Sequence, residues 1–302
     1  MNGLPGCVAL PEGRFLAELA HRFARTRLSE ADVRAARSHI AGHWQFRAWQ
    51  MPLPMEDRPF EPTTLHGFMG NFVHAFARAQ ELPETGLRYF VDQFPDNILY
   101  APDLLRHFPA ARFVHLIRDG RATAASVKPL DWGPNTALRA ALWWKRYLAA
   151  GETLRRSVPP AGLYELRYER LVEDEASVVA ELRRFLGLAD HPLDTGRPFI
   201  LPGYTRSQHV LVRKPADESR ITAWRTRLSA REIRTFESIA GDDLLRLGYE
   251  LVGPVERRPP GLVEQAALLA YDALKKQWNR IVYRRRRDIG RGVPRRPARS
   301  AP

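Results

Sequence analysis

The stretch Phe108-Pro-Ala-Ala-Arg-Phe-Val-His-Leu-Ile-Arg-Asp-Gly-Arg-Ala-Thr-Ala-Ala-Ser126 decides how this chain folds. Residues 111–118 form a compact apolar run rich in strand-forming side chains, which predicts a β-strand. A turn follows at Asp119 and Gly120, and a helix is expected over residues 121–127. Arg118 therefore comes at the carboxyl end of a strand, which is where open α/β sheets bind their ligands.

Strands and helices alternate on both sides of this stretch. Further strands are predicted at residues 87–91 and 162–167. Apolar residues at helical spacing predict helices at residues 12–36, 64–79, 102–108, 136–156, 173–186 and 231–247. This alternation predicts an α/β fold with a parallel sheet.

The composition excludes several classes of protein. The chain has 302 residues, of which 44% are hydrophobic, so it can bury a sizeable core. No apolar run approaches the roughly 20 residues that a membrane span needs, and the first residues lack the pattern of a signal peptide. The single cysteine, Cys7, excludes an internal disulfide framework and a cysteine-built zinc site. A cytoplasmic compartment is therefore expected.

The net charge of +13 suggests nucleic-acid binding, but the distribution of the charge argues against it. Residues 255–302 hold 11 Arg and 2 Lys against 4 acids, a surplus of +9, which leaves +4 for the rest of the chain. The body also lacks a nucleic-acid recognition motif. A mildly basic body suits an enzyme for a polyanionic nucleotide.

Arg118 and Ser126 have the chemistry of a phosphate site. A guanidinium offers a planar fork that matches phosphate oxygens, and a hydroxyl adds a further donor. The start of the intervening helix would contribute backbone N–H groups and the positive end of its dipole. The alternative is that Arg118 makes a strand-end salt bridge with Asp119 or another neighbour.

The segment Phe90-Val-Asp-Gln-Phe-Pro-Asp-Asn97, followed by residues 108–126, resembles the central block of the bacterial sulfotransferases. Members of that family use 3'-phosphoadenosine 5'-phosphosulfate as donor. The resemblance implies a P-loop NTPase-like α/β fold, a three-layer parallel sheet with helices on both faces. It also implies that Arg118 and Ser126 bind the 3'-phosphate of the donor, and that transfer needs no metal ion.

The resemblance extends over about residues 8–252, so we expect a domain over residues 1–254. Leu166-Arg-Tyr-Glu-Arg-Leu-Val172 is similar to a family segment that would place Tyr168 near the adenine; the alternative is an ordinary strand-end aromatic residue. His209-Val-Leu-Val-Arg-Lys-Pro215 resembles a late loop that closes over the 3'-phosphate. Arg213 and Lys214 match its basic pair, and the alternative is a solvated basic loop.

Two departures concern the reactive end of the donor. The family's loop for the 5'-phosphosulfate, roughly Gly-x-x-Arg-Ser-Gly-Thr-Thr, has no counterpart here, which predicts an N-terminally truncated fold. Gln93 stands where many members have Lys, so it keeps hydrogen bonding without the charge. The alternative function is therefore a degenerate, inactive binding module that keeps only the 3'-phosphate site. A P-loop kinase is excluded, because Gly-x-x-x-x-Gly-Lys-Ser/Thr is absent.

Transfer to a hydroxyl or amine acceptor requires a general base. Glu12, in Leu10-Pro-Glu-Gly-Arg-Phe15, matches the glutamate that several family members use. The alternative is an acid that only complements a helix dipole. The acceptor is left open among carbohydrates, lipids, phenols and peptides, because acceptor pockets are built from variable loops such as residues 51–64.

The C-terminal segment, residues 255–302, forms a second region. Residues 261–283 have the pattern of an amphipathic helix, and the basic, proline-containing stretch after it is expected to be disordered. A basic amphipathic helix can lie on an anionic membrane surface, which would make the chain peripheral to a membrane. The alternative is a helix packed on the domain, followed by a solvated tail.

Overall fold

The computed structural model describes residues 4, 6–49, 51, 63–82, 86–188, 217–252 and 258–289. The chain divides into two compact units. Unit 1 comprises residues 1–111, 186–210 and 287–302, and unit 2 comprises residues 112–185 and 211–286. Each unit contains its own pair of parallel strands.

In unit 1, strand β1 (Cys7–Ala9) pairs in parallel with β4 (Tyr89–Val91). The Leu10 N–H continues the ladder by donating to the Val91 carbonyl at 3.0 Å. β4 is predicted from the sequence, and β1, which has the same length, is not. Gly6 precedes β1 with φ +75°, and a Cβ there would lie 2.8 Å from the Gly86 carbonyl oxygen. Glycine is therefore required where the chain enters this strand.

The helices of unit 1 correct one prediction. Residues 12–36 do not form one helix, because β2 (Arg27–Leu28) separates α1 (Phe15–Arg22) from α2 (Glu30–Gly42). Ser29 starts α2 with a reciprocal capping box to Asp32, which fixes the break. The helix predicted at residues 64–79 is confirmed. The other elements of this unit are α3 (Trp44–Ala48), β3 (Thr63–Thr64), α4 (Leu65–Ala79), η1 (Pro95–Tyr100) and α5 (Ala101–His107).

An aromatic cluster forms the core of unit 1. Phe15 of α1 lies with its ring centre 5.4 Å from Trp49, 5.8 Å from Phe72 and 6.3 Å from Phe46, in edge-to-face arrangements. Phe76 extends the cluster through Trp49 at 5.7 Å. Such ring pairs stabilise a core beyond their buried area. They therefore hold α1, α3 and α4 together and anchor the start of α1, which follows the Glu12 turn.

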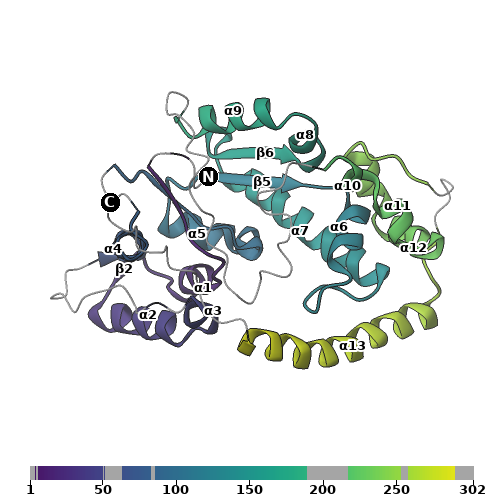
Figure 1. Ribbon diagram of the computed structural model, residues 1–302, viewed down its shortest axis with the longest axis horizontal. Helices are drawn as coiled ribbons and strands as arrows, with labels where there is room; N and C mark the ends of the chain where they lie inside the picture. Colours follow the sequence, from purple (N-terminus) through teal and green to yellow (C-terminus); the bar gives the residue numbers. More distant parts are fainter. Residues whose placement is uncertain are drawn as a thin grey trace, which may run out of the picture. The chain divides into compact units, whose positions relative to one another are not determined.

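In unit 2, β5 (Phe113–Ile117) pairs in parallel with β6 (Leu163–Arg167), and Ile117 lies opposite Arg167 (Figure 1). Both strands are predicted from the sequence and confirmed. The crossover between them contains α6 (Gly120–Val127), α7 (Ala137–Ser157) and the short η2 (Pro160–Gly162). The chain continues through α8 (Tyr168–Glu173) and α9 (Glu175–Phe185).

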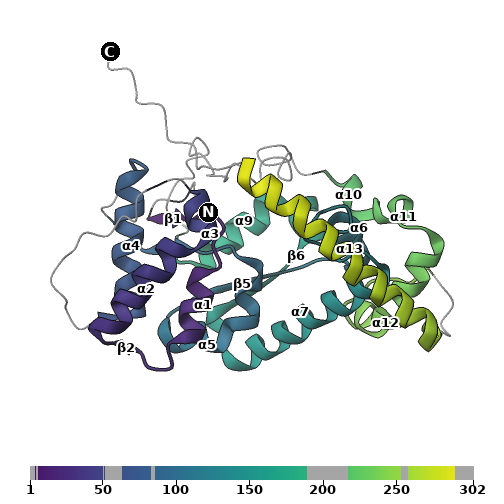
Figure 2. The ribbon, with the colours of Figure 1, turned by 90° about the horizontal axis from the view of Figure 1, so that it is seen from below.

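The other described elements of unit 2 are the helices α10 (Ser219–Thr222), α11 (Trp224–Arg227) and α12 (Ala230–Arg246), and most of α13 (Leu262–Ile289). Figure 2 shows α13 as one long helix. Ile117 of β5, Trp144 of α7 and Phe236 of α12 are buried in one hydrophobic cluster. This packing holds the end of β5 against the two long helices.

The described residues therefore form a mixed α/β fold with short parallel strand pairs. Their strands make three separate two-stranded sheets, so the single three-layer sheet stays a prediction, as does the division at residues 254 and 255. Within the described ranges, no helix has the length and apolar composition that crossing a bilayer requires.

Candidate functional site

Arg118 follows directly after β5, and three contacts fix the backbone around it. The Trp144 indole N–H donates to the Arg118 carbonyl oxygen at 3.2 Å. The next residue, Asp119, donates its backbone N–H to Glu169 Oε1 at 3.0 Å, and Tyr249 donates its hydroxyl to Glu169 Oε2 at 3.1 Å. The strand end is thus clamped by side chains from α7, α8 and the segment after α12.

The Arg118 side chain is a cation without a carboxylate partner among the described residues. Its Nη2 donates to the Arg220 carbonyl oxygen at 2.9 Å, while its buried Nε has no hydrogen-bond partner in this part of the chain. The guanidinium lies 4.1 Å from the centre of the Tyr168 ring. Burial lowers the pKa of Arg118, and the positive charge of Arg220 acts in the same direction.

The salt bridge considered between Arg118 and Asp119 does not form, because Asp119 binds Arg121. Arg121 Nη2 lies 2.8 Å from Asp119 Oδ2, and its Nη1 lies 2.5 Å from Glu237 Oε1. The Arg121 guanidinium also lies 3.9 Å from the centre of the Trp224 ring. Arg121 is 2% exposed and Glu237 is 1% exposed, so this network is a buried, fully paired counterpart of Arg118.

The start of α6 offers less to an anion than its sequence suggests. Asp119 caps the helix, and its Oδ1 accepts the Arg121 N–H at 2.8 Å. This amide is therefore not available to a ligand, and a carboxylate already occupies the positive end of the dipole. Ser126, further along α6, lines a hollow of about 290 Å³ with Lys128 and Arg227.

Tyr168 begins α8 at the end of β6, as its position in the sequence suggests. The parallel register pairs Ile117 with Arg167, so the residues that follow each strand come together at one edge. Two residues predicted for different parts of the donor, Arg118 and Tyr168, are thereby in direct contact. The structure places Tyr168 beside Arg118, the residue expected to bind the 3'-phosphate.

A second set of polar residues follows the strands of unit 1. Glu12 comes three residues after β1, and Asp92 and Gln93 come directly after β4. Glu12 lies two residues before the N-cap of α1, Arg14, so it is not in the first turn of that helix. A Cβ on the intervening Gly13 would lie 2.4 Å from the Phe15 ring, so this turn requires a glycine.

The carboxyl groups of this set are shifted toward their neutral forms. Burial, with the nearby Asp96, raises the pKa of Glu12. Burial also raises the pKa of Asp92 to about 6; the charge of Glu12 adds to this, while hydrogen bonds from Phe94 and Asn97 oppose it. Gln93, directly after Asp92, is exposed. A carboxylate with a raised pKa in a partly buried turn is suited to accept a proton.

Some site residues were missed and others lie outside the described residues. Asp92 and Asp96 stand inside the quoted Phe90–Asn97 segment, where their acidic spacing was the available signal. Arg121 gives no such signal, because its partner Glu237 is 116 positions away. Arg213, Lys214 and residues 52–62 of the expected acceptor loop are not among the described residues.

Comparisons with known proteins identify the family. A family model described as the sulfotransferase family matches residues 7–192, which is more than half of the chain. This chain belongs to the sulfotransferase family. A solved sulfotransferase domain from the curacin biosynthetic pathway is 17% identical to this sulfotransferase-family chain, covering 80% of it and 88% of the domain, with a TM-score of 0.47. No curated protein matches the chain.

Proposed function

We propose that this chain transfers a sulfuryl group from 3'-phosphoadenosine 5'-phosphosulfate to a hydroxyl or amine acceptor. Family membership supports the reaction type. The observation that carries the choice of donor is Arg118, a half-buried side chain whose buried Nε has no hydrogen-bond partner among the described residues. The proposal includes the three-layer sulfotransferase fold and a cytoplasmic location.

The 3'-phosphate of the donor would satisfy Arg118. Glu169 and Asp119 attract the half-buried Arg118 guanidinium without forming an ion pair with it, and a phosphate would supply a direct counter-charge and oxygen acceptors. Tyr168 holds the guanidinium plane from one side at 4.1 Å, which restricts the fork to one orientation. Ser126 and Arg227 line a hollow that does not include Arg118, and they would add donors if the phosphate reaches it, with Arg213 and Lys214 as a closing loop.

The chemistry at the other end of the donor is a displacement at sulfur. The acceptor oxygen or nitrogen forms a bond to sulfur while the bond from sulfur to the bridging phosphate oxygen breaks. Glu12 takes the acceptor proton, and 3'-phosphoadenosine 5'-phosphate leaves with the electron pair of the broken bond. Gln93 would donate hydrogen bonds to the sulfuryl oxygens. The acceptor class stays open among carbohydrates, lipids, phenols and peptides.

A degenerate binding module would share the 3'-phosphate site but lack turnover. Both functions predict that Arg118 binds 3'-phosphoadenosine 5'-phosphate, so binding alone does not separate them. Transfer of labelled sulfate from the donor to a mixed panel of acceptors does separate them. Labelled product that depends on Glu12 would establish the enzyme, and binding without any transfer would establish the module.

The nucleotide assignment is tested by titrating 3'-phosphoadenosine 5'-phosphate, and adenosine 5'-phosphate in parallel, into the purified chain. Arg118→Ala should weaken binding of the first ligand by about 100-fold, as expected for a lost charge-assisted hydrogen-bond pair, and leave the second almost unchanged. Arg112→Ala, at the opposite end of the same run, is the matched control and should bind normally. No binding at millimolar ligand, or equal binding by Arg118→Ala, would overturn the assignment.

A further inference from the structure

Helix α13 packs on unit 2 through its polar side. Its most buried described residues are Asp272 and Asn279, which are 5% and 9% exposed. Asp272 Oδ1 accepts the Asn135 backbone N–H at 2.7 Å, and Asn279 Nδ2 donates to Asn135 Oδ1 at 3.0 Å. Asn135 therefore bridges two successive turns of the inward side of α13, and hydrogen bonds fix which side faces the protein.

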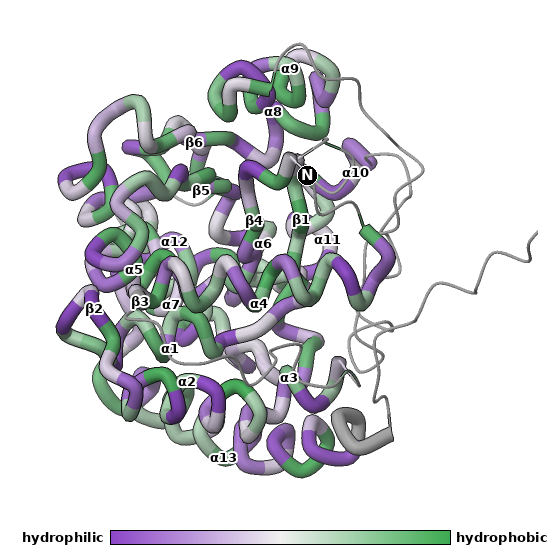
Figure 3. The backbone as a smooth tube through the Cα atoms, turned by 90° about the vertical axis from the view of Figure 1, so that its left-hand side faces the viewer, coloured by the Kyte–Doolittle hydropathy of each residue, from purple (hydrophilic) through white to green (hydrophobic). Residues whose placement is uncertain are grey.

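The outward side of α13 is apolar. Val263, Leu274, Trp278 and Ile281 are 86%, 73%, 64% and 47% exposed. Their spacing of eleven, four and three residues places them on one side of a helix, and Figure 3 shows hydrophilic and hydrophobic stretches alternating along α13. A helix on the surface of a protein normally buries its apolar side. Here the polar contacts of Asp272 and Asn279 force the opposite orientation.

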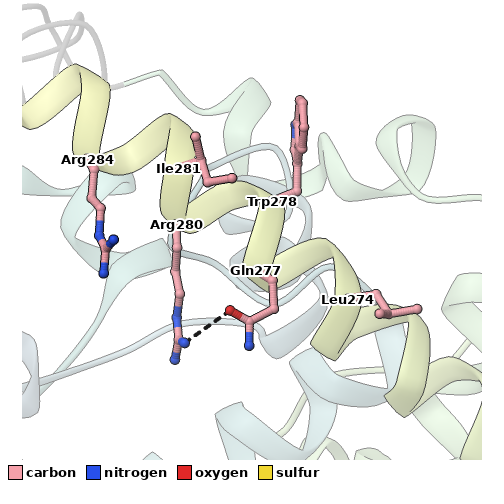
Figure 4. A pocket seen from close by; sticks show the side chains of 6 residues that line it. All are labelled: Leu274, Gln277, Trp278, Arg280, Ile281 and Arg284. Carbon is pink, nitrogen blue, oxygen red and sulfur yellow. Dashed lines mark hydrogen bonds between the residues drawn. The ribbon is translucent and has the colours of Figure 1, made fainter.

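Basic side chains flank this apolar side. Figure 4 shows Gln277, Arg280 and Arg284 projecting together from one side of the helix and Trp278 from the other. Arg280 donates to Gln277 at 3.2 Å, and its side chain is exposed. Further exposed cations in the described part of the helix are Lys275, Lys276 and Arg285. Over residues 262–289 the sequence holds seven basic residues against three acids.

We propose that the outward side of α13 docks the chain on an anionic membrane surface. Leu274 and Ile281 would enter the boundary of the acyl chains, and Trp278 would lie at the level of the head groups, where tryptophan is favoured. Arg280 and Arg284 would bind the lipid phosphates. Each cation near such a surface contributes attraction, so the apolar and basic sides act together.

The charge pattern favours a membrane over a second copy of the chain. In a symmetric pair the same patch faces itself, which would bring Arg280 and Arg284 close to their own copies and to Lys275 and Lys276. Like charges at such an interface oppose association. An anionic bilayer offers the complementary charge over its whole area and also accepts the apolar side chains.

The test is co-sedimentation of the full chain with vesicles of phosphatidylcholine that contain about one third phosphatidylserine, and with pure phosphatidylcholine vesicles. Binding to the anionic vesicles should fall by about tenfold or more in Leu274→Ser/Trp278→Ser, because partitioning follows the buried apolar area. The matched double variant Trp132→Ser/Leu245→Ser removes exposed apolar residues elsewhere in unit 2 and should bind like the parent. Arg280→Gln/Arg284→Gln should lose about fivefold for each cation.

Three outcomes would overturn the proposal. The first is no preference of the parent chain for anionic vesicles. The second is unchanged binding of Leu274→Ser/Trp278→Ser, since the basic stretch after residue 289 would then account for binding without the helix. The third is a stable dimer in sedimentation velocity that Leu274→Ser/Trp278→Ser dissociates, with no vesicle binding, which would assign this side to self-association.

Discussion

The two parallel strand pairs end in opposite kinds of charge. After β1 and β4 the chain places the carboxyl groups of Glu12 and Asp92. After β5 and β6 it places the Arg118 guanidinium against the Tyr168 ring. The backbone arrangement is the same in both units: two strands pair in parallel, so the residues that follow them come together at one edge. The chemistry at each edge is set by the first residues after the strands.

Burial acts on the two ends with opposite signs. It raises the pKa of Glu12 and of Asp92, and it lowers the pKa of Arg118. In each case the low-dielectric surroundings favour the neutral form. A carboxylate that is poised to take a proton suits a base, and a desolvated cation suits a phosphate. This difference is the basis on which we propose proton transfer at the end of unit 1 and nucleotide recognition at the end of unit 2.

A second contrast lies within unit 2, between two arginines three residues apart. Arg121 is held by Asp119 and Glu237 on both edges and by Trp224 on its face. Arg118 has an aromatic ring on its face and no carboxylate among the described residues. Arg121 is therefore fully paired, whereas Arg118 forms no ion pair among the described residues and is the arginine that we propose for the ligand.

The largest expected effect is a loss of sulfuryl transfer without a loss of nucleotide binding, when the carboxyl group at the end of unit 1 is removed. Glu12→Gln should lower the rate of sulfuryl transfer by about 10²-fold to 10⁴-fold, because the acceptor proton then has no base. Its affinity for 3'-phosphoadenosine 5'-phosphate should stay unchanged. The parent rate should fall as the pH drops through the raised pKa of Glu12, and this limb should be missing in the variant. Both are measured with a labelled donor over a pH series.

Glu18→Gln is the matched control for this experiment. Glu18 lies in the first turn of α1 and pairs with Arg14 at 3.3 Å. It shares the charge and the neighbourhood of Glu12 but lies inside the helix. Comparable losses in the two variants would show that Glu12 acts through the local charge, and would remove the base from the end of unit 1.

The elements that sequence reasoning located are those with long or strongly patterned runs. The strands at residues 111–118 and 162–167 and the helix at 136–156 are confirmed within a few residues. β1 was missed, although it is as long as the predicted β4. The break between α1 and α2 was missed because apolar spacing continues through it, although Ser29 and Asp32 carry a capping-box pattern that marks it.

The candidate site was predictable only where its residues follow a strand. Arg118 and Tyr168 stand directly after predicted strands, so the position of each at a strand end follows from the sequence, whereas their contact comes from the structure. The pairing of Arg121 with Glu237 joins residues 116 positions apart. The bridge from Asn135 to Asp272 joins residues 137 positions apart, and it decides the orientation of α13. Local patterns carry no information on such long-range hydrogen bonds.

The next largest effect tests the contrast between the two arginines. Glu237→Leu should lower the free energy of unfolding by about 3–5 kcal/mol, because it leaves Arg121 buried with one carboxylate fewer. It also removes the oxygen that accepts the Val252 N–H at 3.0 Å. Glu237→Gln keeps an acceptor of the same shape and should lose less. Denaturant unfolding of both variants, beside Arg118→Ala, measures the difference.

Arg118→Ala should unfold close to the parent in that series, since no ion pair is lost with it. A loss as large as that of Glu237→Leu would make Arg118 a structural residue like Arg121. Nucleotide affinity should show the reverse order, with Arg118→Ala weakest. The two measurements together assign one arginine to stability and the other to binding.

The smallest expected effect is the pH dependence of the free energy of unfolding that comes from Asp92, directly after β4. Burial raises the pKa of Asp92 from 3.8 to about 6, so the folded state holds its proton more tightly than the unfolded state. The free energy of unfolding should therefore fall as the pH rises from about 4 to about 6, by on the order of 1–3 kcal/mol. Asp92→Asn should remove this fall and be the more stable protein at neutral pH, as measured by denaturant unfolding from about pH 4 to 7.

Asp103 on α5 gives the control of opposite sign. Although burial opposes it, hydrogen bonds from His21 at 2.7 Å and Arg106 at 2.8 Å lower the pKa of its carboxyl group. Its ionised form therefore stabilises the fold, and Asp103→Asn should destabilise the chain at neutral pH. If both variants shifted stability in the same direction, burial would not be what sets Asp92 apart. The acidic end would then be an ordinary charged turn, without the raised pKa that a proton acceptor uses.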